Sequence, residues 1–372
     1  MTDLTIVVPT YNRSLLLKNC LEFIQKQDQG IAIIIADSSI ESEKLVNRKT
    51  VEHLGGNIRY LEFANDVNIL DKIFQAIEQV TTSFACMCAD DDLIVLESAL
   101  KCTEFLIQNH DYVACHGHYL RYSITDSESI LLEDWEYRGP SLTGDTPSKR
   151  AIELLSNYEA LFYAVQKTTT LRMSLEAMTT SPYTMHMELA NGLWLALAGK
   201  VKRIDGLHYL RQAGNAALHF RGEPYSYFAR HFTTIMSDYN DMAEKLLARF
   251  KLAYPDVEEK EADLLQVLCF GFLIYLYRSI NFIVLARQMI PNYSESDLSF
   301  LRQMRPPTFR PSIRFVLNEF TERGMRYLKT KVLQKMGPIA IRSNTTGHSV
   351  YISRVLNYGL TNQYREEIRR LF

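Results

Sequence analysis

The first ninety residues of this 372-residue chain alternate short apolar runs with segments whose apolar residues recur at helical spacing. A run such as "LTIVVP" is typical of a strand buried on both faces, and "SLLLKNCLEFIQKQ" is typical of a helix. Strands that alternate with helices in this way form a mostly parallel sheet flanked by helices, so the expected class is α/β and Rossmann-like. The predicted strands lie at 4–9, 31–39, 57–63 and 84–89, and the predicted helices at 14–27, 41–53 and 67–80.

Polar side chains gather where three of the predicted strands end. They form the clusters "PTYNR" at 9–13, "DSS" at 37–39 and "DDD" at 90–92. The carboxyl ends of parallel strands lie along one edge of a sheet, and ligands of such sheets bind beyond that edge. We therefore expect the three clusters to converge on one ligand site.

The three consecutive aspartates at 90–92 need compensation, because burying unpaired charges costs several kcal/mol. Water, a basic neighbour or a metal ion would each supply it. Oxygen ligands suit Mg²⁺ and Mn²⁺, which often share their protein carboxylates with substrate phosphates. Alternatively, the acids open the next helix, where the helix dipole favours negative charge. The residues alone leave both interpretations open.

The remainder of the chain is predicted to be mainly helical after a polar middle. Residues 119–148 are mostly polar and are expected to form a long loop or lid. Periodic apolar residues at 225–253 and 261–290 predict long helices. The expected division is a sheet domain at 1–222 and a mainly α-helical carboxy-terminal region at 223–372.

Charge is distributed unevenly although the whole chain carries a net charge of only −2. Residues 301–372 hold 14 Lys or Arg and 4 Asp or Glu, a net of +10, which leaves −12 for residues 1–300. The overall balance gives no reason to expect a nucleic-acid partner. The segment 314–335 mixes basic and apolar residues, so it is either a helix on an anionic membrane surface or an ordinary solvated face.

The chain shows no signal peptide at "MTDLTIVVPTYNRS", and its six cysteines lie mostly within apolar patterns. We therefore expect free thiols and a cytoplasmic location, with contact at the inner face of the membrane if the basic segment binds lipid. The apolar stretch at 264–286 is interrupted by Arg278, Ser279 and Asn281, so a membrane span is not expected.

Four segments together resemble the nucleotide-sugar domain of the family 2 glycosyltransferases, which have the GT-A fold. They are "TIVVPTYNR", "IIIADSS", "NILDKIFQAI" and "CADDDLI". Their order and spacing are similar over residues 3–120 and more weakly to 220. The resemblance implies an inverting transfer from a nucleotide-sugar, with UDP as the expected nucleotide and Mn²⁺ or Mg²⁺ as the expected cofactor.

The resemblance also implies roles for residues at the strand ends. The loop after the first strand would cradle the uridine and diphosphate, Asp37 would accept a hydrogen bond from the base, and the aspartate cluster matches the Asp-x-Asp signature. Position 89 is Ala where the family often has Asp, so the metal ligand is either Asp91 or Asp92. Lys72 is either a nucleotide contact or an exposed helix lysine. The expected donor-site residues are Pro9, Thr10, Tyr11, Arg13, Asp37, Asn65 or Asn68, Lys72 and Asp90.

The family's catalytic base comes from an acidic pair that opens a helix, and "HMELANGLWLALAGK" resembles that segment. Glu188 is the only carboxylate there, because Leu189 stands in the place of the second acid. A carboxylate of this kind removes the proton of the acceptor hydroxyl as it attacks the anomeric carbon. The alternative is that Glu188 is simply an acid at a helix amino terminus.

The segment "LHYLRQAGNAALH" resembles the family segment that closes over the diphosphate. Arg211 would then meet phosphate oxygens, and His208 or His219 would complete the metal shell. Asp134 and Trp135 are the expected acceptor contacts in the polar middle. The expected acceptor is a glycan or a lipid-linked glycan of surface-polysaccharide synthesis, and a homo-oligomer is left open.

Two other functions remain open at this point. A nucleotidyltransferase uses a similar sheet and metal, but "PTYNRS" lacks the glycine-rich loop that such an enzyme needs. A non-catalytic scaffold or glycan-binding subunit would keep the fold without a complete acid pair, as at Glu188.

Overall fold

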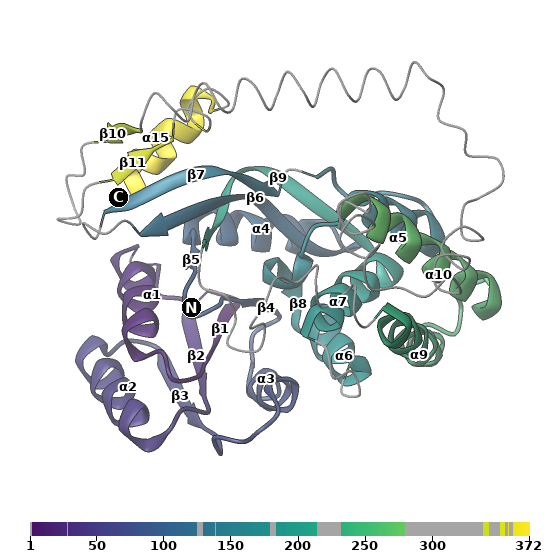
Figure 1. The fold of residues 1–372 in the computed structure, drawn as a ribbon, viewed down its shortest axis with the longest axis horizontal. Helices are drawn as coiled ribbons and strands as arrows, with labels where there is room; N and C mark the ends of the chain where they lie inside the picture. The colour runs from purple at the N-terminus through teal and green to yellow at the C-terminus, as the bar shows by residue number, and fades with distance from the viewer. Residues whose placement is uncertain are drawn as a thin grey trace, which may run out of the picture.

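The computed structural model describes residues 2–27, 29–124, 129–137, 139–178, 184–213, 232–279, 338–341, 350–353, 356 and 360–372. Within this part of the chain, one mixed sheet of eleven strands is flanked by helices, as the α/β prediction requires (Figure 1). The strands are β1 (Leu4–Thr10), β2 (Ala32–Asp37), β3 (Ile58–Glu62), β4 (Phe84–Met87), β5 (Leu93–Ile94), β6 (Tyr112–Ile124), β7 (Ile130–Tyr137), β8 (Val165–Lys167), β9 (Lys200–Gln212), β10 (Ile339–Ile341) and β11 (Val350–Ile352).

The strand order is β10-β11-β7-β6-β8-β4-β1-β2-β3, and β9 pairs with both β5 and β6. The four strands β4-β1-β2-β3 are parallel. Alternate residues of β1 enter different cores: Val7 packs on the side of α3 (Ile69–Ile77), whereas Ile6 and Val8 pack on the side of α1 (Ser14–Lys26). Burial on both faces explains why this strand is apolar without alternation. The sheet prediction for this part is confirmed.

The expectation of a long loop or lid at 119–148 is wrong. Residues Tyr119 to Ile124 of β6 pair antiparallel with β7, with register shifts beside Leu120 and Arg121. Leu120, Tyr122 and Leu132 are buried in a hydrophobic cluster of their own. Polar residues between these buried positions obscure this pair in the sequence.

The helices cover both faces of the sheet. The predicted helices at 225–253 and 261–290 correspond to α9 and α10 over the described residues, and these two helices share a core with α5 and α7. The helices not yet given are α2 (Glu41–Leu54), α4 (Leu96–Gln108), α5 (Pro147–Ser156), α6 (Thr168–Met178), α7 (Thr184–Ala198), α9 (Phe232–Ala253), α10 (Glu261–Ser279), α15 (Asn362–Leu371) and the short 3₁₀ helix η1 (Leu161–Tyr163).

Helix α7 is held at its carboxyl end by a buried arginine from α5. Arg150 Nε donates to the carbonyl of Ala196 at 2.7 Å, and Arg150 Nη2 donates to that of Leu197 at 2.9 Å. These bonds satisfy carbonyls that a helix end leaves without partners. The predicted domain boundary at 222 falls outside the described residues and stays a prediction.

The carboxy-terminal residues return to the sheet, which the prediction of a mainly helical region does not include. Strand β11 pairs in parallel with β7, and α15 lies beside these strands (Figure 1). Tyr364 of α15 hydrogen-bonds His118 of β6, the Leu207 amide donates to Glu367 at 3.1 Å, and the ring of Phe372 lies 5.9 Å from that of Phe23. None of the helices among the described residues has the length and apolarity to cross a bilayer.

Candidate donor and catalytic site

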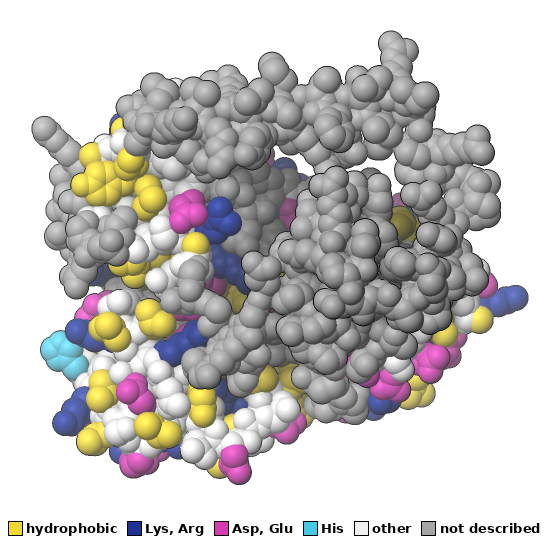
Figure 2. Space-filling view, in the orientation of Figure 1, with side chains coloured by type: hydrophobic (Ala, Val, Ile, Leu, Met, Phe, Trp, Pro, Cys, Tyr) yellow, Lys and Arg dark blue, Asp and Glu magenta, His cyan; other side chains and the backbone are white. Residues whose placement is uncertain are grey.

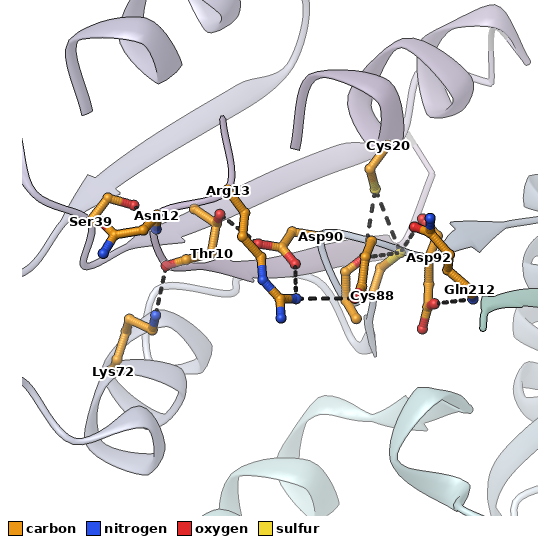
Figure 3. Close-up of polar contacts among 12 residues, drawn as sticks. Thr10, Asn12, Arg13, Cys20, Ser39, Lys72, Cys88, Asp90, Asp92 and Gln212 are labelled. Atoms are coloured by element: carbon orange, nitrogen blue, oxygen red, sulfur yellow. Dashed lines mark hydrogen bonds and ion pairs between the residues drawn. The ribbon is translucent and has the colours of Figure 1, made fainter. Parts of the chain in front are cut away.

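The loops after β1 and β2 are tied together by Asn12. Its φ of 53° is left-handed, a conformation that asparagine adopts more readily than most residues. The Asn12 amide donates to Ser39 Oγ at 2.8 Å, and Asn12 Oδ1 accepts from the Ile40 amide at 2.9 Å. Two of the three polar clusters predicted to converge are therefore in direct contact, with Asn12 and Ser39 adjacent in Figure 3.

The aspartate cluster is compensated by a neighbouring cation and a hydroxyl from the β1 loop. Thr10 Oγ1 donates to Asp90 Oδ2 at 2.7 Å. Arg13 Nη1 lies 3.2 Å from Asp90 Oδ1 and 3.0 Å from Asp91 Oδ2, so one guanidinium nitrogen bridges two carboxylates (Figure 3). The acids also precede α4 by several residues and lie outside its first turn, so they do not serve to open that helix.

The three aspartates occupy different electrostatic environments. Burial raises the pKa of Asp90 to about 6, with a further rise from Asp91, and Thr10 and Arg13 oppose the change. Burial also raises the pKa of Asp92 well above its usual value, although the Gln212 amide donates to Asp92 Oδ1 at 2.8 Å. Asp91 is the most exposed of the three, and its Oδ1 has no hydrogen-bond partner among the described residues. Asp91 is therefore the carboxylate best placed to meet a ligand.

Lys72 is buried, which excludes the interpretation of an exposed helix lysine. Its Nζ donates to the Thr10 carbonyl and to Ser38 Oγ, both at 2.8 Å. Burial lowers the pKa of Lys72 to about 8, and the nearby Asp37 and Asp90 oppose that shift. On the face drawn in Figure 2, acidic, basic and hydrophobic side chains intermingle over α1, α2 and β3. Arg13 and Lys72 thus supply local positive charge at this edge rather than belonging to a broad basic surface.

Asp37 is fully buried and its carboxylate is occupied by internal partners. The Ser39 amide donates to Oδ1 at 2.7 Å, Asn47 Nδ2 donates to Oδ2 at 2.7 Å, and the Tyr60 hydroxyl also donates to Oδ2. These bonds shape the β2 loop. Because Asp37 is buried, a hydrogen bond from a nucleobase to its carboxylate, as the resemblance implied, would require the surrounding residues to move.

The other predicted donor residues lie around the same edge. Asn68 caps α3, because its Oδ1 accepts from the Leu70 amide at 2.8 Å, and Asn65 is exposed in the loop before it. Pro9 and Tyr11 are partly exposed on either side of Thr10. These residues are close to the cluster in the chain, and their contacts to a nucleotide stay predictions.

The described residues fit a divalent cation that is shared with a ligand, and do not form a complete protein cage. Among them, no group of three or more His, Cys, Asp or Glu is placed to hold a metal. A Mg²⁺ or Mn²⁺ ion often takes only one or two protein carboxylates, with phosphates and water completing its shell. The free oxygen of Asp91 meets that smaller requirement.

Of the two predicted histidine ligands, His208 does not add to this set. His208 is buried with Nδ1 3.2 Å from Ser98 Oγ and Nε2 3.2 Å from the Tyr163 carbonyl, so both of its ring nitrogens are engaged. His219 lies outside the described residues.

Strand β9 brings the predicted second half of the site toward the aspartates. Leu210 and Tyr209 pair with β5, which follows the aspartate turn directly, and the adjacent Arg211 guanidinium lies 6.0 Å from the centre of the Tyr163 ring. The Tyr163 hydroxyl donates to Glu188 Oε1 at 3.0 Å. Glu188, Arg211 and the aspartate turn are thus connected through a tyrosine that the sequence analysis missed.

Tyr163 lies in no motif that sequence reasoning could have used, and Tyr209 lies in the quoted segment "LHYLRQAGNAALH" without a role assigned to it. In a short apolar segment, an aromatic residue is most simply interpreted as part of the core. The predicted acceptor residues Asp134 and Trp135 lie in β7, where their backbones pair with Arg121 and Leu120. Their role stays a prediction.

Comparisons with known proteins agree with this arrangement. Residues 5–163 match the family model described as glycosyl transferase family 2. A search of curated proteins by sequence finds no match. Among solved structures, the 1–349 fragment of S. aureus TarS in complex with UDP-GlcNAc is 14% identical, with a TM-score of 0.50, over 74% of this chain and 73% of that one.

Two further structures are similar at lower TM-scores. Another structure of the same TarS fragment is 14% identical over 74% of this chain and 72% of that one, with a TM-score of 0.48. The mannosyltransferase PcManGT from Pyrobaculum calidifontis, in complex with GDP-Man and Mn²⁺, is 14% identical over 81% and 79%, with a TM-score of 0.43. At these identities the likeness speaks for the fold alone. Residues 5–163 thus match a glycosyl transferase family 2 domain, and the described residues have a GT-A-like fold.

Proposed function

We propose that this protein transfers a sugar from a nucleotide-sugar, with a UDP-sugar as the first candidate, to a hydroxyl of a glycan or lipid-linked acceptor, with inversion at the anomeric carbon. The observation that carries this proposal is the cluster of Thr10, Arg13, Asp90 and Asp91 at the carboxyl ends of β1 and β4. It lies inside the family 2 domain and at the sheet edge where α/β proteins bind ligands.

In this proposal the β1 loop and α3 supply the electrostatics of donor binding. The diphosphate is a dianion, and Arg13 is a partly exposed cation beside the aspartates, while Lys72 adds positive charge from behind the loop. When bound at Asp91, Mn²⁺ or Mg²⁺ neutralises charge on the departing diphosphate. Arg211, close to Tyr163, is a second guanidinium for the phosphates.

Glu188 is the proposed base that accepts the proton of the acceptor hydroxyl. It lies past the first turn of α7, which contains no acidic residue, so the interpretation of Glu188 as a helix-opening acid loses its support. Its carboxylate is held by Tyr163, whose neighbours Tyr209 and Arg211 border the aspartate turn. That placement favours a base facing the donor.

The proposed acceptor and cellular location have less support than the proposed donor. A lipid-linked acceptor and contact with the inner face of a membrane depend on the basic segment 314–335, which lies outside the described residues. The cytoplasmic location, the surface-polysaccharide pathway and homo-oligomer formation remain proposals from the sequence.

The test is a thermal-shift screen with UDP, GDP, CDP and their sugar conjugates, with and without Mn²⁺, followed by turnover of any donor that stabilises the protein. A ligand that binds only the folded state raises its melting temperature. We expect one nucleotide to stabilise more strongly with Mn²⁺, and Asp91→Ala to abolish that increment. Asp205→Ala is the matched control, because Asp205 is exposed on β9. Nucleotide binding without any turnover would favour the scaffold function instead.

A further inference from the structure

Two stacked tyrosines connect the aspartate turn to Glu188. The rings of Tyr163 and Tyr209 lie 4.9 Å apart at an interplanar angle of 27°. Tyr163 ends η1, and Tyr209 belongs to β9, so the pair joins segments that are far apart in the chain. Phe162 meets Tyr163 edge-on at 5.7 Å and Tyr119 lies 5.3 Å from Tyr209, so both rings are held from a second side.

The Tyr209 hydroxyl is bound to the aspartate turn. It accepts a hydrogen bond from the Ala89 amide at 2.9 Å and donates to Cys88 Sγ at 3.8 Å. Ala89 begins the turn that the Asp92 amide closes through the Ala89 carbonyl at 3.1 Å. Tyr209 therefore fixes the backbone from which Asp90 and Asp91 project.

The Tyr163 hydroxyl is bound to the other half of the site. It donates to Glu188 Oε1, while the backbone carbonyl of Tyr163 is held by His208 Nε2 and by the Cys86 thiol, both at 3.2 Å. The position of the hydroxyl is thus set by the backbone of η1 as well as by the ring stack. A donor fixed in this way restricts the Glu188 carboxylate to one orientation.

We propose that Tyr163 is a positioning residue for Glu188, and that its stack on Tyr209 sets the separation between Glu188 and the donor-binding aspartates. This inference rests on the proposed function, because it assumes that Glu188 is the base. In it, neither tyrosine contacts a reacting atom. Tyr163 orients the carboxylate, and Tyr209 holds the turn.

The charges around Tyr163 determine what its loss would do. Among the described residues these are Glu188 of α7, Arg211 of β9 and Asp92 of the turn. The Tyr163 hydroxyl donates to the Glu188 carboxylate, so it fixes the position of one carboxylate oxygen. Without this bond the carboxylate is freer to rotate.

The experiment compares Tyr163→Phe with Tyr209→Phe, which both keep the aromatic stack and remove one hydroxyl. For Tyr163→Phe we expect kcat to fall about tenfold, with an unchanged KM for the donor. For Tyr209→Phe we expect the reverse split, with a higher KM for the donor and an unchanged kcat.

A second measurement does not depend on turnover. Urea midpoints of Tyr163→Phe, Glu188→Gln and the double variant form a mutant cycle that reads their contact directly. We expect the two losses not to add, whereas the corresponding cycle of Tyr209→Phe with Glu188→Gln should be additive. Additive losses for Tyr163 and Glu188 would overturn the inference.

The two proposals fail in different ways. If the wild type turns over a donor but Tyr163→Phe keeps the wild-type kcat and donor KM, the positioning role is wrong and the transferase function stands. If the wild type turns over none of the donors, the proposed function is wrong, and the mutant cycle still decides whether Tyr163 holds Glu188.

Discussion

The donor-binding edge and the region around Glu188 are built in different ways. The donor edge takes its residues from consecutive strand ends between Thr10 and Asp90, and their buried polar atoms bind one another. The Glu188 region is formed by residues of η1, α7 and β9, and among the described residues Tyr163 donates a hydrogen bond to Glu188. Removing one charge from a buried network lowers the free energy of unfolding, whereas changing a single partly exposed carboxylate affects it little. Changes at the donor edge should therefore cost stability, and changes around Glu188 should cost turnover.

The largest expected effect is that of Glu188→Gln on turnover. Loss of a general base costs about 10²- to 10⁴-fold in rate, so kcat should fall by that factor. The melting temperature should fall by no more than loss of the Tyr163 hydrogen bond accounts for, and its increase with nucleotide should stay at the wild-type value, because the amide is isosteric. Glu104→Gln, an exposed change on α4, is the control for the loss of one negative charge. Retained turnover in Glu188→Gln would remove Glu188 as the base.

Unlike Glu188→Gln, Arg13→Ala should strongly lower the free energy of unfolding. It leaves Asp90 and Asp91 without their cation, and breaking a buried ion pair costs about 3 kcal/mol at the lower end of the usual range. The lower end applies because the Arg13 side chain is 21% exposed. Urea unfolding at neutral pH measures the change, and nucleotide affinity should fall with it.

The chain offers a close control for Arg13 in Arg48. It also bridges two carboxylates, those of Glu41 and Glu62, but does so at the surface. Exposed pairs contribute little to stability, so Arg48→Ala should leave the urea midpoint close to that of the wild type. Equal falls in the urea midpoint of Arg13→Ala and Arg48→Ala would mean that burial does not make the Arg13 ion pairs more stabilising than the surface pairs of Arg48.

Comparison with Lys72→Met should reveal two pH dependences of opposite sign in the wild type, one in the free energy of unfolding and one in nucleotide affinity. The pKa of Lys72 is about 8 in the folded chain against an ordinary 10.5, so the unfolded chain binds more protons between these values. From this group, the wild-type free energy of unfolding therefore rises as the pH increases through that window. Affinity for a diphosphate should instead fall above about pH 8, by at most roughly tenfold per unit, because the positive charge is lost.

Both trends should be absent from Lys72→Met. Unfolding and nucleotide titrations at pH 7, 8 and 9 test them together. Lys44→Met is a useful control, since Lys44 donates to the Phe63 carbonyl from the neighbouring α2. A nucleotide affinity with the same pH dependence in wild type and Lys72→Met would show that Lys72 does not act on the donor.

The donor edge could be predicted because its signals are local. A strand that ends at Thr10, at Asp37 or shortly before Asp90 places the polar residues of its end at a known edge, whichever helices follow. The partners within the cluster could not be predicted in the same way. Nothing in the sequence indicates that Asp37 is enclosed by Asn47 and Tyr60, or that Lys72 is turned inward against Thr10.

The Glu188 region was only partly predictable because its residues meet through tertiary packing. The helix that carries Glu188 resembles a family segment, but Tyr163 precedes Glu188 by 25 residues and lies in no motif. The β6–β7 pair was mistaken for a loop for a related reason. Tyr122 and Leu132 face a core completed by residues such as Val350 and Ile368, more than 200 positions away.

The smallest expected effect tests the part of the fold that the sequence did not reveal. Tyr364→Phe removes the hydroxyl of α15 that binds His118, and loss of one such hydrogen bond costs about 1 kcal/mol in the free energy of unfolding. Nucleotide affinity and kcat should not change, because His118 and α15 belong to neither half of the site. Gln363→Ala, at an exposed neighbouring position, should be neutral. A change in donor KM for Tyr364→Phe would mean that docking of the carboxy-terminal helix is transmitted through β6 and β9 to the aspartate turn.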